Sequence, residues 1–236
     1  MHKPRGIASV WLCGLFLVGC AAPQATRQQG ATPDINKRFK GEVNVDEWVD
    51  IFEGESRELY KRRHEIVDAM GLKPGMAVAD VGAGTGFFSI LFARRVGPTG
   101  KVYAVDIAPD FLKHIDQEAR KNGLRNITTV HCTDDSVELP PESIDLAFIC
   151  DVYHHFEYPR QSMRSIRRAL RPGGEVVVID FIRVEGCSRD WVIKHVRAGR
   201  EEVTREIIAD GFEPVTDGPR PPALEENYII RFRKPE

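Results

Sequence analysis

An apolar run that ends in a glycine-rich turn constrains the fold of this chain more than any other feature. Residues 77–81 read Ala-Val-Ala-Asp-Val, and residues 82–86 continue Gly-Ala-Gly-Thr-Gly. The apolar run is typical of a buried strand, and the apolar residues within 87–93 indicate a helix directly after the glycines. A strand, a tight glycine turn and a helix in this order predict the first unit of a doubly wound α/β domain.

Strands and helices alternate along the rest of the chain. Helices are expected at 59–70, 109–122, 159–170 and 199–210. Further strands are expected at 101–107, 127–131, 144–150, 175–181, 212–215 and 228–232. Repeated strand-helix units predict parallel pairing with helices on both faces, and the last two strands are expected to form an antiparallel edge. The fold class is therefore α/β, a doubly wound and mostly parallel seven-stranded sheet.

The first twenty residues resemble an export signal. A basic start is followed by the apolar run 7–18, which is short for a transmembrane helix. Residues 17–20 read Leu-Val-Gly-Cys and resemble the lipobox of bacterial lipoproteins. The resemblance implies a signal peptide at 1–19 and a lipid anchor on Cys20, which would hold the protein at a membrane of the cell envelope facing the periplasm. A leader that is not used would leave the protein in the cytoplasm.

Composition limits the remaining possibilities. Residues 20–45 lack apolar periodicity and predict a flexible tether, so the folded domain is expected at 46–236. A hydrophobic fraction of 42% suits one domain, and a formal net charge of −2 disfavours a nucleic-acid partner. The cysteines lack the spacing of a disulfide framework or a zinc site, and no metal is expected.

A second acidic residue strengthens the case for a nucleotide-binding site. Asp106 ends the strand after the glycine turn, where its carboxylate can accept hydrogen bonds from both hydroxyls of a ribose. These features also occur in NAD-dependent oxidoreductases, so that function stays open. The glycine spacing here is G-x-G-x-G rather than G-x-G-x-x-G, which disfavours an oxidoreductase.

Four segments together resemble one family. Residues 78–86, VADVGAGTG, resemble the first motif of class I, Rossmann-like S-adenosylmethionine-dependent methyltransferases. Residues 102–107, 134–140 and 170–174 resemble that family's ribose motif, its adenine-contacting segment and the turn before its fifth strand. The resemblance implies S-adenosylmethionine as the cofactor and a small molecule as the methyl acceptor.

The resemblance also implies roles for single residues. Those expected to bind the cofactor from the first motif and the second strand are Asp80, Gly82, Ala83, Gly84, Gly86, Asp106 and Ile107. Asp80 would help to orient the ammonium group, Asp106 would hold the ribose, and Ile107 would pack on the adenine. Asp135, with Asp134 as second choice, would accept a hydrogen bond from the adenine amino group, although both aspartates also suit a solvated turn.

The segment after the fourth expected strand carries the catalytic candidates. Residues 150–156 read Cys-Asp-Val-Tyr-His-His-Phe and in this family lie beside the methyl group. Asp151, His154 and His155 are the nearest candidates, and Asp151 is also expected to bind the cofactor. A histidine can act as a general base for an acceptor that arrives protonated, and His195 is a further candidate. Alternatively, one of the paired histidines caps the following loop and the other faces solvent.

Two questions stay open at this stage. Residues 52–57 either fold over the cofactor as a lid, closed by Glu53 or Arg57, or form an ordinary surface helix. S-adenosylmethionine is a charged molecule made in the cytoplasm, which conflicts with a protein exported to the envelope. A non-catalytic envelope lipoprotein that keeps a nucleotide-binding fold is therefore an alternative to the methyltransferase and to the oxidoreductase.

Overall fold

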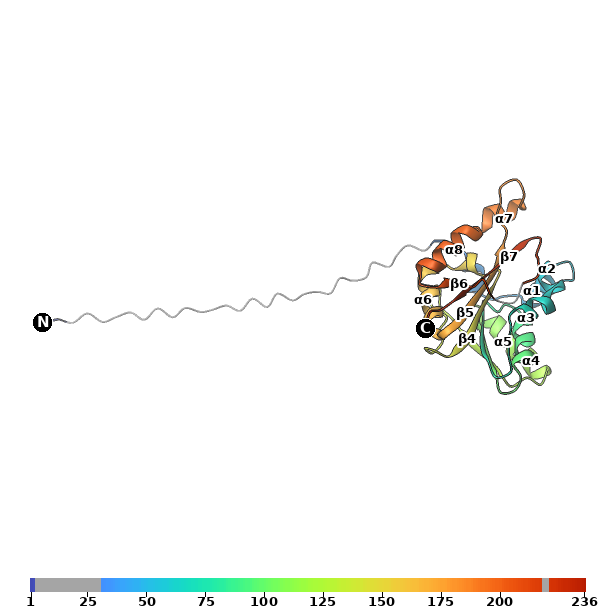
Figure 1. Ribbon diagram of the computed structural model, residues 1–236, viewed down its shortest axis with the longest axis horizontal. Coiled ribbons are helices and arrows are strands. Elements are labelled where there is room, and N and C mark those ends of the chain that lie inside the picture. Colours follow the sequence, from blue (N-terminus) through green and yellow to red (C-terminus); the bar gives the residue numbers. More distant parts are fainter. Residues whose placement is uncertain (3–30, 218–220) are drawn as a thin grey trace.

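The computed structural model describes residues 1–2, 31–217 and 221–236 of the chain. Helices lie on both sides of one central sheet (Figure 1). The predicted signal peptide, apart from its first two residues, and the predicted lipidation site Cys20 lie outside the described residues. Within the described ranges, no helix is both long and apolar enough to cross a membrane.

The sheet of the described residues has seven strands. They are β1 (Ala77–Val81), β2 (Lys101–Asp106), β3 (Ile127–His131), β4 (Ile144–Cys150), β5 (Leu170–Phe181), β6 (Glu213–Pro214) and β7 (Asn227–Arg233). Their order is β3-β2-β1-β4-β5-β7-β6. The first five strands pair in parallel, and β7 pairs antiparallel with both β5 and β6. The predicted fold class is confirmed, and the strand order reverses direction between β1 and β4.

The helices that cover the sheet match most of the predicted ranges. They are α1 (Val45–Phe52), α2 (Glu58–Lys61), α3 (Arg63–Ala69), α4 (Phe87–Val96), α5 (Pro109–Lys121), α6 (Pro159–Ala169), α7 (Asp190–His195) and α8 (Arg200–Ala209). Short 3-10 helices, η1 (Lys37–Phe39) and η2 (Tyr153–His155), precede α1 and follow β4. The single helix expected at 59–70 is divided at Arg62 into α2 and α3.

Two strands also differ in length from the expected ranges. β5 begins at Leu170 instead of residue 175, because Leu170 already pairs with Ile144 of β4. β6 contains only Glu213 and Pro214, although the Val215 amide still donates to the Arg231 carbonyl of β7.

Apolar packing on both faces places the sheet at the centre. All five residues of β1 are buried. Val78 packs with Phe92 in the core beneath α3 and α4, whereas Ala79 packs with Ile166 in the core beneath α6 and α8. A parallel strand covered on both faces carries apolar residues on both of them, which explains why the run at 77–81, with Asp80 as its one polar residue, does not alternate.

The predicted tether differs from the structure over residues 31–45. The Ala31 amide donates to the carbonyl of Glu157, Asn36 and Phe39 are buried, and α1 begins at Val45. Isolated side chains anchor this segment to distant parts of the domain. Such contacts leave no apolar periodicity in the sequence, which is why the segment resembles a tether.

Gly86 joins the glycine turn after β1 to helix α4, and its tight packing can be tested directly. Its φ is +81°, and a Cβ atom there would lie 2.5 Å from Cγ1 of Ile115 on α5. Gly123 also has a positive φ, but a Cβ there would meet nothing within 4 Å. Gly86→Ala should therefore lower the free energy of unfolding by about 1–3 kcal/mol more than Gly123→Ala, as overpacking does. Urea denaturation of both variants measures this, and equal losses would contradict the packing at Ile115.

Candidate functional site

A cavity of about 740 Å³ opens beyond the carboxyl ends of the parallel strands. Its lining includes residues that follow β1, β2, β3 and β4 and also part of the segment from Asn36 to Glu58. The strand order reverses at β1 and β4, the place where doubly wound sheets bind their ligands. A volume of this size is typical of small-molecule sites.

The glycine turn after β1 forms one wall. Gly82 has a φ of +72°, and a Cβ there would lie 2.4 Å from the Val152 side chain. Gly84 has a φ of +54°, and a Cβ there would lie 3.1 Å from the Phe52 ring. Both positions therefore require glycine, because a side chain would have to adopt a strained backbone and displace its neighbour.

Asp106 holds this turn in place. Its buried carboxylate accepts hydrogen bonds of 2.8 Å from the backbone amides of Gly84 and Ala108, one on each oxygen. Burial raises the pKa of Asp106, and these amide hydrogen bonds oppose the shift. A carboxylate has about four lone-pair sites, so both oxygens keep a site that can accept from a ligand hydroxyl.

Asp80 lies behind the turn rather than on the cavity wall. Its buried carboxylate accepts a 2.6 Å hydrogen bond from Ser89 Oγ at the start of α4. Burial raises the pKa of Asp80 to about 7, while the hydrogen bond from Ser89 opposes the shift. Because this pKa lies near neutral pH, a nearby cation would readily shift the Asp80 carboxyl to its ionised form.

Asp151 occupies the end of β4 in a left-handed conformation, with a φ of +53°. Its oxygens accept from Arg57 Nη2 at 2.7 Å and from Asn227 Nδ2 at 2.6 Å. Burial raises the pKa of Asp151, and the charge of Arg57 opposes this. Of the two residues expected to close a lid, Arg57 lines the cavity and contacts Asp151, whereas Glu53 does not line it.

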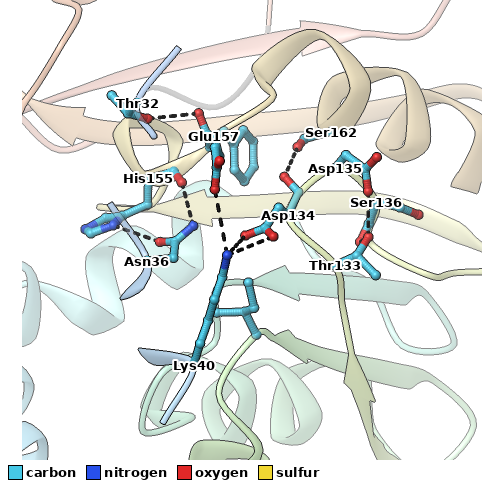
Figure 2. A network of polar contacts seen from close by, with 12 residues as sticks. Thr32, Asn36, Lys40, Thr133, Asp134, Asp135, Ser136, His155, Glu157 and Ser162 are labelled. Atoms are coloured by element: carbon cyan, nitrogen blue, oxygen red, sulfur yellow. Dashed lines mark hydrogen bonds and ion pairs between the residues drawn. The ribbon is translucent and has the colours of Figure 1, made fainter. Parts of the chain in front are cut away.

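The N-terminal segment, residues 31–45, contributes to the cavity wall and contacts two distant loops through side-chain hydrogen bonds and ion pairs (Figure 2). Asn36 Nδ2 donates to the carbonyl oxygen of His155 at 3.0 Å. Lys40 Nζ lies 2.7 Å from Asp134 and 3.7 Å from Glu157. No sequence pattern pointed to these contacts, because they join residues about a hundred positions apart.

The two candidate adenine contacts separate in the structure. Asp134 lines the cavity and pairs with Lys40, whereas Asp135 accepts a 2.8 Å hydrogen bond from Thr133 Oγ1 and does not line it. Asp134, the second choice made from the sequence, therefore lines the cavity, and Asp135, the first choice, does not. Neighbouring side chains in a loop point in different directions, and no local pattern indicates which one faces the cavity.

An aromatic cluster covers one end of the cavity. Phe39, Trp48, Phe52 and Phe111 form this aromatic cluster, with Trp48 and Phe52 ring centroids 5.0 Å apart. Ile107 packs against it. We call this end, with Gly82, Gly84 and Asp106, the cofactor end.

Three histidines meet at the other end. His154 is buried, and its Nδ1 lies 2.7 Å from Asp180 Oδ1, while its backbone amide donates to the other oxygen of Asp180. His155 Nδ1 lies 3.2 Å from Asn36 Oδ1, and His195 Nε2 lies 3.4 Å from His155 Nε2. After the methyl acceptor that the sequence predicts beside them, we call these histidines, with Phe181 and Trp191, the acceptor end. The alternative of one capping and one solvent-facing histidine does not describe this arrangement.

The protonation of the histidines follows from their surroundings. Burial alone would lower the pKa of His154, but the Asp180 carboxylate raises it above the ordinary histidine value. Burial and the neighbouring histidines lower the pKa of His155 to about 2. Burial also lowers the pKa of His195. His155 and His195 are therefore neutral imidazoles at neutral pH.

The cavity brings together most of the residues predicted from the sequence. Those that line it are Gly82, Gly84, Asp106, Ile107, Asp134, Asp151, His154, His155 and His195. Those that do not are Asp80, Ala83, Gly86 and Asp135. Asn36, Trp48 and Asp180 were not predicted, since their importance depends on contacts made only in the folded chain.

Comparison with known proteins identifies a family. A family model described as a methyltransferase domain matches residues 72–218. The ubiquinone/menaquinone biosynthesis C-methyltransferase UbiE of Ectopseudomonas mendocina is 31% identical over 133 residues, which are 56% of this chain and 51% of that protein. The chain thus spans about half the length of the curated relatives that it matches.

Solved structures with the same fold differ in activity. A SAM-dependent methyltransferase from Aquifex aeolicus superimposes with a TM-score of 0.68 at 22% identity, covering 81% of this chain and 99% of that one. The [4+2]-cyclase SpnF superimposes with a TM-score of 0.62 at 19% identity, covering 73% of this chain and 80% of that one. The fold therefore does not by itself specify the reaction.

The buried carboxyl of Asp80 gives the fold a pH dependence. A carboxyl whose pKa is raised by folding stabilises the fold fully below its unfolded value near 3.8, and this contribution is lost as the pH rises through about 7. The side chain in Asp80→Asn does not ionise. Between about pH 4 and pH 7, the melting temperature of this variant should therefore fall by several degrees less than the melting temperature of the wild type. Thermal unfolding at both ends of the window measures this, with Asp50→Asn, an exposed position, as the control. Parallel profiles for Asp80→Asn and wild type would contradict the assignment.

Proposed function

The chain belongs to the methyltransferase domain family, and on this premise we propose that it transfers a methyl group from S-adenosylmethionine to a small-molecule acceptor. The observation that carries the proposal is the glycine turn whose Gly84 amide is held by Asp106 at the wall of the cavity. The turn leaves space for the methionine part of the cofactor, and the remaining lone pairs of Asp106 suit the ribose hydroxyls.

The rest of the cofactor end suits a cofactor bound with its methionine part at the glycine turn and its ribose at Asp106. Ile107 and the aromatic cluster offer an apolar surface for the adenine, and Asp134 offers a carboxylate for its amino group. Asp151 lines the cavity, and its carboxylate would face the positively charged sulfonium. Asp80, with a pKa near 7, lies behind the glycine turn, where its ionised carboxylate would attract the ammonium group of the ligand through the turn.

The acceptor end is suited to a small molecule with an apolar part. Phe181 and Trp191 pack edge to face with ring centroids 4.9 Å apart, and the three histidines supply the polar groups. Methyl transfer from a sulfonium needs the acceptor atom to be aligned with the methyl group, so positioning does much of the work. The UbiE relatives are named for carbon methylation in quinone biosynthesis, which supports an acceptor of this kind.

Cofactor binding tests this proposal against its alternatives. The purified chain is titrated calorimetrically with S-adenosylmethionine and, in parallel, with NAD. Binding of S-adenosylmethionine alone is the expected result. Binding of NAD alone would support the oxidoreductase, and binding of neither would support an envelope protein with another ligand.

Asp106 is the residue on which cofactor binding should depend most. Asp106→Ala removes the group that holds Gly84 and the ribose, and charged hydrogen bonds contribute about 1.5–3 kcal/mol each, so the affinity should fall by at least about tenfold. Asp135→Ala is the matched control, because that carboxylate does not line the cavity. Unchanged affinity for Asp106→Ala in the same titration, with the fold checked by circular dichroism, would remove the ribose assignment.

We also propose that the domain is anchored to the cell envelope through Cys20, on the basis of the lipobox-like residues 17–20. Cys20→Ser should move the protein from the membrane fraction to the soluble fraction and abolish labelling with a radioactive fatty acid. Cys13→Ser is the control, since that cysteine lies inside the apolar run and should remain without effect. Equal fractionation of both variants and the wild type would contradict the anchor.

A further inference from the structure

We propose that His154, His155 and His195 form a binding site for a late first-row divalent cation such as zinc. The site lies at the acceptor end and would hold the cation by three imidazole nitrogens. Its existence does not depend on the cofactor, but its use in methyl transfer rests on the proposed function.

The spacing of the ring nitrogens carries the inference. One nitrogen from each of the three histidines lies within 4.8 Å of the others. The Nε2 atoms of His155 and His195 are 3.4 Å apart. A tetrahedral zinc ion with zinc–nitrogen distances of about 2.0–2.1 Å separates two ligand nitrogens by about 3.3–3.4 Å. This pair therefore already has the separation of two zinc ligands, and small rotations bring the third nitrogen into position.

Polar partners on the far side of two rings orient them for coordination. Asn36 Nδ2 donates to the carbonyl of His155, so Asn36 Oδ1 accepts from His155 Nδ1 and leaves a lone pair on His155 Nε2. Asp180 accepts from His154 Nδ1 at 2.7 Å and leaves His154 Nε2 available in the same way. Metal-binding histidines almost always donate their other ring N–H to a carboxylate, carbonyl or similar acceptor.

The surroundings also favour a cation over three separate imidazoles. The ring centroid of His154 lies 4.4 Å from the ring centroid of His155 and 5.2 Å from that of His195. Three imidazole rings therefore lie close together in one small space. The buried Asp180 carboxylate next to His154 would balance part of the charge of a cation. A general base needs one imidazole, whereas this site draws histidines from η2 and from α7, 40 residues apart.

The donor set indicates which ions fit. Three imidazoles without a thiolate suit zinc and its late first-row neighbours and disfavour magnesium or calcium, which prefer oxygen ligands. A site with three protein ligands keeps a fourth position for water or substrate. All three histidines line the cavity, so that fourth position would be open to the acceptor end.

Metal titration of the full chain tests the inference. The metal-free protein is titrated with zinc chloride in a calorimeter, and bound zinc is counted by mass spectrometry after removal of the excess. One zinc per chain is the expected result. Cobalt in the same site should give the intense visible absorption of tetrahedral coordination. Absence of stoichiometric zinc and cobalt binding would overturn the inference.

Variants identify the ligands. His195→Ala, on the short helix α7 near the surface, should lower zinc affinity at least tenfold and abolish the tetrahedral cobalt spectrum. His64→Ala, an exposed histidine on α3, is the matched control and should bind zinc like the wild type. Unchanged zinc affinity in His195→Ala would assign the metal to other groups, such as the cysteines, and would overturn the inference.

Asp180, the hydrogen-bond partner of His154, allows a second, independent measurement. Asp180→Asn should lower zinc affinity by roughly 10–100-fold, as loss of such partners does, while the cobalt spectrum stays tetrahedral. An unchanged affinity in this variant would contradict the role of Asp180. Titration of the wild type with S-adenosylmethionine separates the two proposals. Zinc binding without cofactor binding would contradict only the proposed function, and cofactor binding without zinc binding would contradict only the metal site.

Discussion

The hydrogen bonds that the Asp106 carboxylate accepts from the Gly84 and Ala108 amides organise the site. They connect the end of β2 to the turn after β1, so the two strand ends and the glycine backbone act as one unit. The reversal of strand order between β1 and β4 then opens a space beside this unit, and the cavity occupies that space. The Val152 and Phe52 side chains approach this turn so closely that Gly82 and Gly84 leave no space for a Cβ atom.

Sequence reasoning succeeded where structure depends on neighbouring residues. The strand at 77–81, the glycine turn and Asp106 form a local pattern with a definite physical cause, and His154 and His155 follow a strand end in the same way. Sequence reasoning failed where contacts between residues far apart in the chain determine how a segment or a side chain is placed. Asn36 and Lys40 hold residues 31–45 onto loops about a hundred positions away, and Asp180 partners His154 across 26 residues. No period or motif records such contacts.

The fold narrows the function without completing it. A cyclase and methyltransferases share this architecture, so the chemistry resides in the side chains at the two ends of the cavity. The cofactor end combines the backbone of the glycine turn and the Asp106 carboxylate with the aromatic cluster. The acceptor end is built from histidines and aromatic rings of η2, β5 and α7.

The two ends are also physically connected by the N-terminal segment. Phe39 packs with Trp48 at the cofactor end, and its ring lies 5.7 Å from that of His155 at the acceptor end. Asn36 holds the ring of His155 in place, and Lys40 holds Asp134. The same short segment therefore helps to position residues at both ends of the cavity, so a change in its placement would alter the surroundings of both ends together.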